Sequence, residues 1–213
     1  MTITKEQIAK DLLSIRAVFL KPDDPFTWAS GIHSPIYCDN RLTLSAPAVR
    51  KDVEAGLAEI VKEMFPDAEM LMGTSTSCIA HAAIAATILD LPMGYVRSGH
   101  KDHGRQNQIE GKMEPGTKVV VIEDLISTGG SVLEVVDVLR QAGAEVLGIA
   151  SIFTYGLQKG VERLAAADVV NYSLSDFDTL SKVAAAEGYI ADKDIAKLTA
   201  FQKNPQDPAW MEL

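Results

Sequence analysis

The stretch VVVIEDLISTGGS, from Val119 to Ser131, places two carboxylates directly before a loop of hydroxyl and glycine residues. Backbone N–H groups in such a loop, together with the positive end of a following helix, bind phosphate. Glu123 and Asp124 would repel a phosphate unless they serve another part of the ligand. Sugar hydroxyls are donors that carboxylates accept, so this order of residues predicts a site for a ribose phosphate.

A simpler explanation competes with this one. Ser-Thr-Gly-Gly-Ser is often a plain turn with a helix N-cap, and an acidic residue at a strand end is often solvated. The loop matches neither GxxxxGK[ST] nor GxGxxG. The succession of strand, acidic pair, small-residue loop and helix favours a ligand site over a turn.

A second cluster, RSGHKDHGR, brings Arg97, His100, Lys101, His103 and Arg105 together within one short segment. Most such runs are solvated loops. This run, however, follows a predicted strand in an otherwise acidic chain, and cations placed there would stabilise negative charge on a leaving group. The stretch from Ser98 to Gly116 is also long enough to form a lid that excludes water.

The composition limits the classes of partner. The chain has 213 residues, 20 Lys plus Arg against 29 Asp plus Glu, and a formal net charge of -9, which argues against nucleic acid or acidic membranes as partners. It lacks a signal-peptide pattern and a membrane-spanning run. Cys38 and Cys78 are too few for a disulfide scaffold and have no metal-binding spacing. We expect a cytoplasmic protein.

Helical patterns alternate with short aliphatic runs from residue 46 onward, which predicts an α/β fold with a doubly wound parallel sheet flanked by helices. The loops after Met72, Val96, Ile122 and Phe153 should then converge on one site. We expect a single domain spanning residues 1–213. It would comprise an N-terminal helix and substrate-covering segment (1–45), an α/β core (46–174) and C-terminal helices (175–213).

Val119 to Ser131 closely resembles the phosphoribosyl-pyrophosphate (PRPP) signature of the type I phosphoribosyltransferase family. That signature is a hydrophobic strand, two acidic residues, a hydrophobic pair, and small residues rich in Thr and Gly. The resemblance implies a PRPP site formed by Arg97, Lys101, His103, Glu123, Asp124, Leu125, Ile126, Ser127, Thr128, Gly129, Gly130 and Ser131.

Within this family the chain is most similar to the orotate phosphoribosyltransferases. RSGHKDHG resembles their mobile catalytic loop, and FTWASGIHSPIYCDNR, from Phe26 to Arg41, resembles their N-terminal substrate segment. This implies transfer of the ribose 5-phosphate of PRPP to orotate, giving orotidine 5′-phosphate and pyrophosphate in pyrimidine synthesis. Lys101, His103 and Asp124 would be catalytic.

The same resemblance implies Mg²⁺ as cofactor, although it assigns no residue of the chain as a metal ligand. It also implies a homodimer in which Arg97 and the 97–105 loop serve the other subunit's site. Orotate, a planar anion, would contact Ser127 and Tyr37, but Tyr37 could equally be a core residue.

The chain departs from the common family pattern at Ala29, Ser98, Thr76, Ser77 and Tyr155, where many relatives carry basic or otherwise different residues. The carboxylate of orotate therefore has no obvious partner, with Arg41 or backbone donors as alternatives. A transferase for a purine or another base, or a PRPP-sensing regulator, would fit the PRPP signature alone. Cys78, His33 and His81 are interpreted as packing or surface residues.

Overall fold

The computed structural model describes residues 3–28, 31–97, 99 and 108–213. Its centre is a six-stranded sheet of order β10-β9-β8-β5-β6-β7. The strands are β5 (Met70–Thr74), β6 (Met93–Val96), β7 (Ile109–Glu110), β8 (Lys118–Ile126), β9 (Glu145–Thr154) and β10 (Asn171–Asp176). Neighbouring strands are parallel except for β6 and β7, which pair antiparallel. The predicted α/β class is confirmed.

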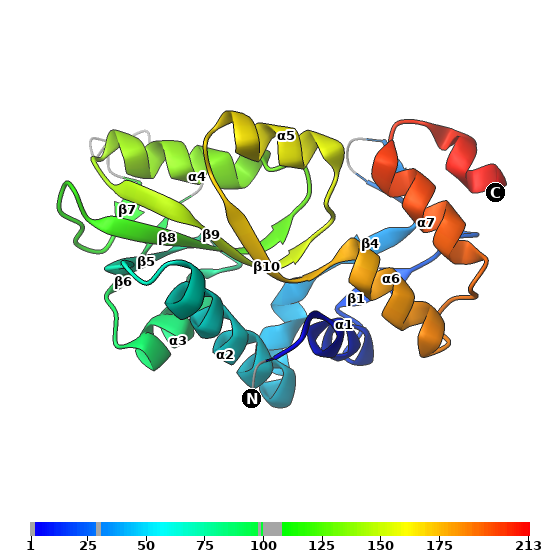
Figure 1. The fold of residues 1–213 in the computed structure, drawn as a ribbon, viewed down its shortest axis with the longest axis horizontal. Helices are drawn as coiled ribbons and strands as arrows, with labels where there is room; N and C mark the ends of the chain where they lie inside the picture. Colours follow the sequence, from blue (N-terminus) through cyan, green and yellow to red (C-terminus); the bar gives the residue numbers. More distant parts are fainter. Residues whose placement is uncertain (1–2, 29–30, 98, 100–107) are drawn as a thin grey trace.

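Helices cover both faces of the sheet (Figure 1). One face packs against α2 (Pro47–Met64) and α3 (Ile79–Leu89), and the other against α4 (Gly130–Gln141) and α5 (Gln158–Ala166). Each parallel connection passes through one of these helices, as the alternating sequence pattern predicted.

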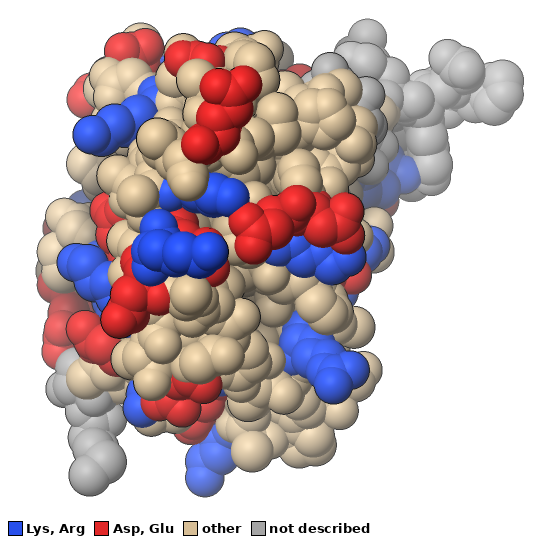
Figure 2. All heavy atoms as spheres, turned by 90° about the vertical axis from the view of Figure 1, so that its right-hand side faces the viewer, with Lys and Arg blue, Asp and Glu red and all other residues tan. Residues whose placement is uncertain are grey.

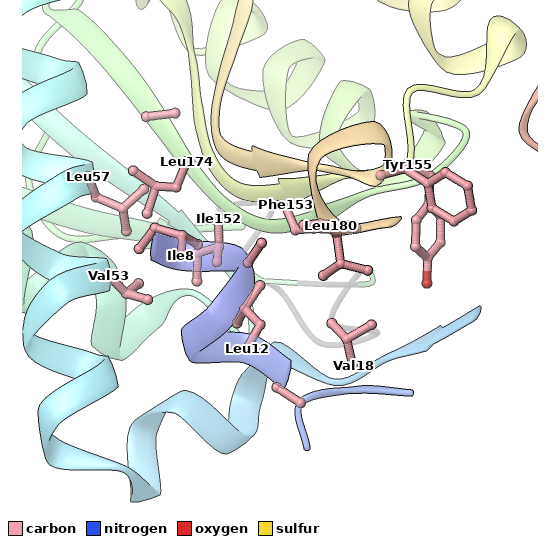
Figure 3. Packing of buried hydrophobic residues seen from close by; sticks show 14 of the residues in the cluster. Ile8, Leu12, Val18, Val53, Leu57, Ile152, Phe153, Tyr155, Leu174 and Leu180 are labelled. Atoms are coloured by element: carbon pink, nitrogen blue, oxygen red, sulfur yellow. The ribbon is translucent and has the colours of Figure 1, made fainter. Parts of the chain in front are cut away.

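The aliphatic run of β8 explains the sheet's position in the core. Val119 to Ile122 are all 0% exposed. Because consecutive strand residues point to opposite faces, a run buried at every position requires a helical layer on each side. On one side, Ile8 and Leu12 of α1 (Lys5–Ser14) pack in a cluster with Val53 and Leu57 of α2 (Figure 3).

The N-terminal segment forms short strands beside the sheet. They are β1 (Val18–Leu20), β2 (Phe26–Thr27), β3 (His33–Ser34) and β4 (Ile36–Cys38), followed by the 3-10 helix η1 (Asn40–Ser45). β1 pairs with β4 and β2 pairs with β3, both antiparallel. Trp28 stacks on Tyr155 with ring centroids 5.7 Å apart, which ties this segment to the end of β9.

The C-terminal part consists of α6 (Phe177–Ala186), α7 (Asp194–Lys203) and the 3-10 helix η2 (Pro208–Glu212). α6 packs on α1, so the C-terminal part of the chain contacts the N-terminal helix. On the face that Figure 2 shows, Lys and Arg side chains are interspersed with Asp and Glu side chains. Among the described residues, no helix has the length and apolarity to cross a membrane.

Two details differ from the sequence prediction. The sequence predicts that the strand is followed by the acidic pair and then by the loop, whereas β8 includes the acidic pair and continues through Leu125 and Ile126, which pair with Phe153 and Thr154 of β9. The two-residue strand β7 was not predicted, since Ile109–Glu110 carries no local strand pattern and is defined by its pairing with β6.

Candidate active site

A cavity of about 340 Å³ lies at the carboxyl ends of β5, β6 and β8. Its lining comprises Thr74, Ser75, Ser77, Val96, Arg97, Gly99, Gln108, Glu123, Asp124, Leu125, Ser131, Glu134, Val135 and Val138. The loops after Met72, Val96 and Ile122 thus converge as predicted, because parallel strands end at the same edge of a sheet. The loop after Phe153 contributes instead to a second cavity, described below.

Glu123 is held firmly at the floor of this cavity. Its side chain is 5% exposed. Glu123 Oε1 accepts hydrogen bonds from the Thr74 hydroxyl at 3.0 Å and from the Asp124 N–H at 2.8 Å. Burial raises the pKa of Glu123 to about 8, and the adjacent Asp124 carboxylate adds to the increase. At neutral pH Glu123 is therefore mostly protonated, so Glu123 and Asp124 are not two equivalent negative charges.

Asp124 is half-buried and is the more accessible member of the pair. Its main-chain carbonyl accepts a 2.7 Å hydrogen bond from the Asn40 side-chain amide, which comes from η1. This contact joins the N-terminal segment to the end of β8 and fixes the backbone from which the Asp124 carboxylate projects.

The small-residue loop turns sharply into α4. Gly129 adopts a φ of +73°, a conformation that favours glycine. α4 begins at Gly130, so the first N–H groups of the helix have no acceptor within it and are suited to an anion. This is the geometry that the sequence predicted for residues 127–131.

Helix α5 supports that loop from behind. Gly160 approaches it so closely that a Cβ there would lie 2.6 Å from the Ser127 carbonyl oxygen. Arg163 donates a 3.3 Å hydrogen bond to the Thr128 carbonyl. A positive side chain thus lies next to the predicted phosphate site.

The two hydrophobic residues of the signature, Leu125 and Ile126, have different environments. Leu125 lines the cavity, whereas the Ile126 side chain is 2% exposed and belongs to the core. The Ile126 carbonyl accepts from the Tyr155 N–H at 2.9 Å. The side chain of Ile126 is therefore not available to a ligand.

A second cavity of about 710 Å³ adjoins the same loop. It is lined by Trp28, Ile32, Ser127, Thr128, Leu157, Gln158, Lys159, Glu162, Lys203, Asn204, Pro205 and Gln206. The loop thus supplies residues to both cavities, with Ser131 at the first and Ser127 and Thr128 at the second. The N-terminal segment reaches the second cavity through Trp28 and Ile32.

Tyr37, the predicted orotate neighbour, is 44% exposed, which excludes the core alternative. Its ring lies 5.7 Å from that of Phe26. Arg41 makes a two-point ion pair with Asp39, with contacts of 2.6 and 2.8 Å, so its guanidinium already has a carboxylate partner within the chain.

Arg97 lines the cavity of its own chain and lies 3.1 Å from Glu110 of β7 through Nε. Ser77 also lines the cavity, Thr76 follows a cis peptide bond after Ser75, and Tyr155 is 3% exposed. The remaining predicted positions lie outside the described residues; they are Ala29, Ser98, His100, Lys101, His103 and Arg105.

Cys78, Glu123 and Asp124 bring ligand atoms within 4.8 Å of one another. Burial raises the pKa of the Cys78 thiol well above its ordinary value, and a protonated thiol is a poor ligand for a hard cation. A carboxyl oxygen of Asp124 does suit Mg²⁺, which commonly uses one or two carboxylates together with substrate phosphates. The site therefore fits Mg²⁺ held with a phosphate ligand, and Cys78 is a buried packing residue, as predicted.

The structure adds residues that the sequence interpretation missed, namely Thr74, Asn40 and Arg163. Thr74 is the last residue of β5, and the loop after this strand was already predicted to reach the site. Its place in the sequence could therefore have identified it as a site residue. Asn40 lies within the predicted N-terminal substrate segment, although its contact with Asp124 was not predicted. Arg163 contacts the loop from a segment distant in sequence, and no local pattern indicates it.

The comparisons with known proteins agree with this geometry. The family model "Phosphoribosyl transferase domain" matches residues 43–181. The chain is 59% identical over 207 residues to the orotate phosphoribosyltransferase of Bacillus cytotoxicus, covering 97% of this chain and 99% of that protein. The crystal structure of orotate phosphoribosyltransferase from Aeropyrum pernix is 29% identical with a TM-score of 0.74, covering 86% of this chain and 99% of that one. Leishmania donovani UMP synthase gives 25% identity and a TM-score of 0.80, covering 93% of this chain and 42% of that longer one.

Proposed function

We propose that this chain, which belongs to the phosphoribosyltransferase family, carries out the orotate phosphoribosyltransferase reaction at the carboxyl ends of β5, β6 and β8, where both cavities adjoin the loop from Ser127 to Ser131. The bond from C1 of the PRPP ribose to a pyrophosphate oxygen breaks, a bond from C1 to N1 of orotate forms, and the N1 proton is released. The products are orotidine 5′-phosphate and pyrophosphate, in a step of pyrimidine synthesis. The observation that carries the choice of orotate is the 59% identity, over nearly the full length, to an enzyme of that name.

The acidic pair supplies the sugar side of the site. As the leaving group departs, the ribose gains oxocarbenium character, and a negative group near it lowers the barrier. Asp124 is the accessible carboxyl and takes this role, accepting hydrogen bonds from the ribose hydroxyls. Glu123, mostly protonated because its pKa is about 8, limits the repulsion between the pair and the nearby phosphates.

The loop from Ser127 to Ser131 and the first turn of α4 hold the 5′-phosphate. Arg163 supports this assignment, because it adds positive charge at the loop and fixes the Thr128 carbonyl. Leu125 and the main chain of Ile126 complete the PRPP contacts, and Ser127 and Tyr37 are assigned to orotate.

The basic residues of the 97–105 loop are assigned to the pyrophosphate group of PRPP. Arg97, Lys101 and His103 meet the pyrophosphate as its negative charge increases, so they act mainly in the transition state. A bound Mg²⁺ would neutralise part of the same charge on the pyrophosphate oxygens. Asp124 would hold that ion, directly or through water.

A direct assay tests the proposal. Orotate absorbance should fall when purified protein is mixed with PRPP and Mg²⁺, and a chelator should stop the reaction. Turnover of hypoxanthine or adenine without turnover of orotate would replace this proposal by a purine transferase. A PRPP-sensing regulator would need a nucleic-acid surface, and the net charge of -9 and the mixed charges of the face in Figure 2 count against one.

We also propose a homodimer in which the 97–105 loop serves the partner's site. Arg97 lines the cavity of its own chain. The proposed contribution to the partner's site therefore falls mainly to Lys101 and His103. Mixing the Lys101→Ala and Asp124→Asn proteins, each of which should have lost most of its activity, tests it. If sites are shared, each mixed dimer contains one intact site, and an equal mixture should regain roughly a quarter of the normal activity. Recovery of none would assign the loop to its own subunit.

The cytoplasm is the proposed location. Cys38 and Cys78 are both free thiols, which suits a reducing compartment. Fractionation of the source cells with an antibody to the protein tests this, and recovery outside the cytoplasmic fraction would contradict it.

A further inference from the structure

A chain of buried polar side chains connects helix α2 to the acidic end of β8. Glu54 and His81 are 2% and 0% exposed, and Glu54 Oε1 lies 2.6 Å from His81 Nδ1. His81 Nε2 lies 3.3 Å from Thr43 Oγ1. The Thr43 hydroxyl donates a 2.6 Å hydrogen bond to the Asn40 carbonyl. The Asn40 amide in turn donates the 2.7 Å bond to the Asp124 carbonyl.

The donors and acceptors of this chain are mutually consistent. Because the Thr43 hydroxyl proton points to the Asn40 carbonyl, its oxygen is free to accept from His81 Nε2, which must then carry a proton. The proton between Glu54 and Nδ1 can reside on either partner. Both arrangements leave Nε2–H as a donor, so the connection to Thr43 is the same in each.

Asn40 is oriented from a second side. Cys38 Sγ lies 3.2 Å from Asn40 Oδ1. Burial raises the pKa of Cys38 well above its ordinary value, so the thiol keeps its proton and donates to that oxygen. With Oδ1 facing Cys38, the NH₂ group of Asn40 must face Asp124. Asn40 is 1% exposed, so water does not compete for either group.

This arrangement is a poor device for stability alone. Burying a Glu–His pair costs desolvation free energy, and well-packed apolar residues commonly do as well or better. Glu54 Oε2 is in addition buried with no hydrogen-bond partner among the described residues. The Glu54–His81 pair instead has a positioning effect, because it holds η1 against β8 through Thr43 and Asn40.

We infer that Glu54, His81, Thr43 and Asn40 form a positioning network that fixes the main chain of Asp124, so that its carboxylate meets the ribose correctly in the transition state. The inference rests on the proposed function. Small errors in the placement of a charged group cost rate and not substrate binding, because the interaction is strongest in the transition state. The network members are positioning residues and do not touch substrate.

A double-mutant cycle on kcat tests the network. Thr43→Val removes the hydroxyl with little change of shape, and Asp124→Asn removes the carboxylate while keeping the carbonyl that Asn40 binds. We expect Thr43→Val to lower kcat about 10-fold in the wild-type background, with the KM for PRPP changed by less than about threefold, and to lower it less than about twofold in the Asp124→Asn background. Equal losses in both backgrounds, or no loss in either, would overturn the inference.

Control variants separate positioning from folding. Thr43→Ser keeps the hydroxyl and should keep kcat near the wild-type value. Ser181→Ala removes another buried hydroxyl, which donates at 2.7 Å to the Phe177 carbonyl in α6, and should leave kcat unchanged. If Thr43→Val does not fold, Asn40→Ala enters the same cycle with the same expected coupling. Turnover of orotate by the wild-type protein reports on the proposed function alone, and the cycle can be run with whichever base the protein accepts.

Discussion

The Thr74 hydroxyl donates a 3.0 Å hydrogen bond to Glu123 Oε1, joining the carboxyl ends of the neighbouring strands β5 and β8. The same oxygen accepts the Asp124 N–H. Both bonds use Glu123 as an acceptor, so both can be kept by a neutral acid. The acidic pair of the signature is therefore chemically asymmetric, with a buried protonatable acid supporting an accessible one.

The first prediction concerns stability and pH. The pKa of Glu123 is about 8 in the folded protein against an ordinary 4.5, so the folded state binds more protons between these values. Stability should fall as the pH rises through this window. Glu123→Gln keeps the oxygen acceptor without the charge, so its Tm should decline less than that of the wild type between pH 5 and 9.

Thermal unfolding across that pH range measures the effect. Glu63→Gln, the same substitution at an exposed position of α2, should follow the wild-type curve. Parallel curves for the wild type and Glu123→Gln would show that Glu123 does not titrate in this window.

The second prediction concerns Lys101. If it meets the pyrophosphate as that group leaves, Lys101→Ala should lower kcat by on the order of 100-fold with a much smaller change in PRPP affinity. Steady-state kinetics and equilibrium PRPP binding measure the two effects separately. Lys112→Ala, which removes a lysine with an 89% exposed side chain, is the control. An unchanged kcat for Lys101→Ala would remove that residue from the mechanism.

The third prediction concerns Arg163, whose hydrogen bond to the Thr128 carbonyl supports the phosphate loop. Arg163→Ala should raise the KM for PRPP several-fold while changing kcat less. Arg140 is a matched control, because it also caps main-chain carbonyls, those of Ala167 and Asp168, away from the loop. A KM that rises equally in Arg140→Ala and Arg163→Ala would argue against a specific role for Arg163.

The fourth prediction concerns the contact between α5 and the same loop. A methyl group at Gly160 would lie 2.6 Å from the Ser127 carbonyl oxygen, so Gly160→Ala must displace the loop. We expect weaker PRPP binding, measured by calorimetry, together with a lower Tm. At Gly56 a Cβ would meet the flexible Leu174 side chain at 2.7 Å, far along the chain from the loop. Gly56→Ala should lower the Tm without weakening PRPP binding, and a loss of binding in both variants would make the Gly160 effect a general one.

The sequence was sufficient for the features that are locally encoded. Residues 119–122 are aliphatic without alternation, which predicted a strand buried on both faces, and the acid-then-glycine order after them predicted the turn into α4. These features depend on residues adjacent in the chain, where side-chain pattern and backbone preference act together.

The sequence was insufficient where long-range pairing decides. Strand β7 is defined by its backbone pairing with β6. The last residues of β8 are extended because they pair with β9, which continues beside them. Asn40, Thr43 and His81 were likewise unassigned or interpreted as packing residues, because their chain of hydrogen bonds forms only when η1, α3 and β8 meet. Glu123 and Asp124 differ in burial, and the local sequence does not specify how deeply each side chain is buried.

The short pairing of β6 with β7 has a consequence for how this enzyme can change over evolution. The Arg97 N–H donates at 2.9 Å to the Gln108 carbonyl, so the two ends of the intervening segment are clamped side by side on the sheet. For a loop with fixed ends, doubling its length costs only about 0.6 kcal/mol of closure entropy. Insertions between Arg97 and Gln108 should therefore leave the pairing of β6 with β7 in place at little cost in stability.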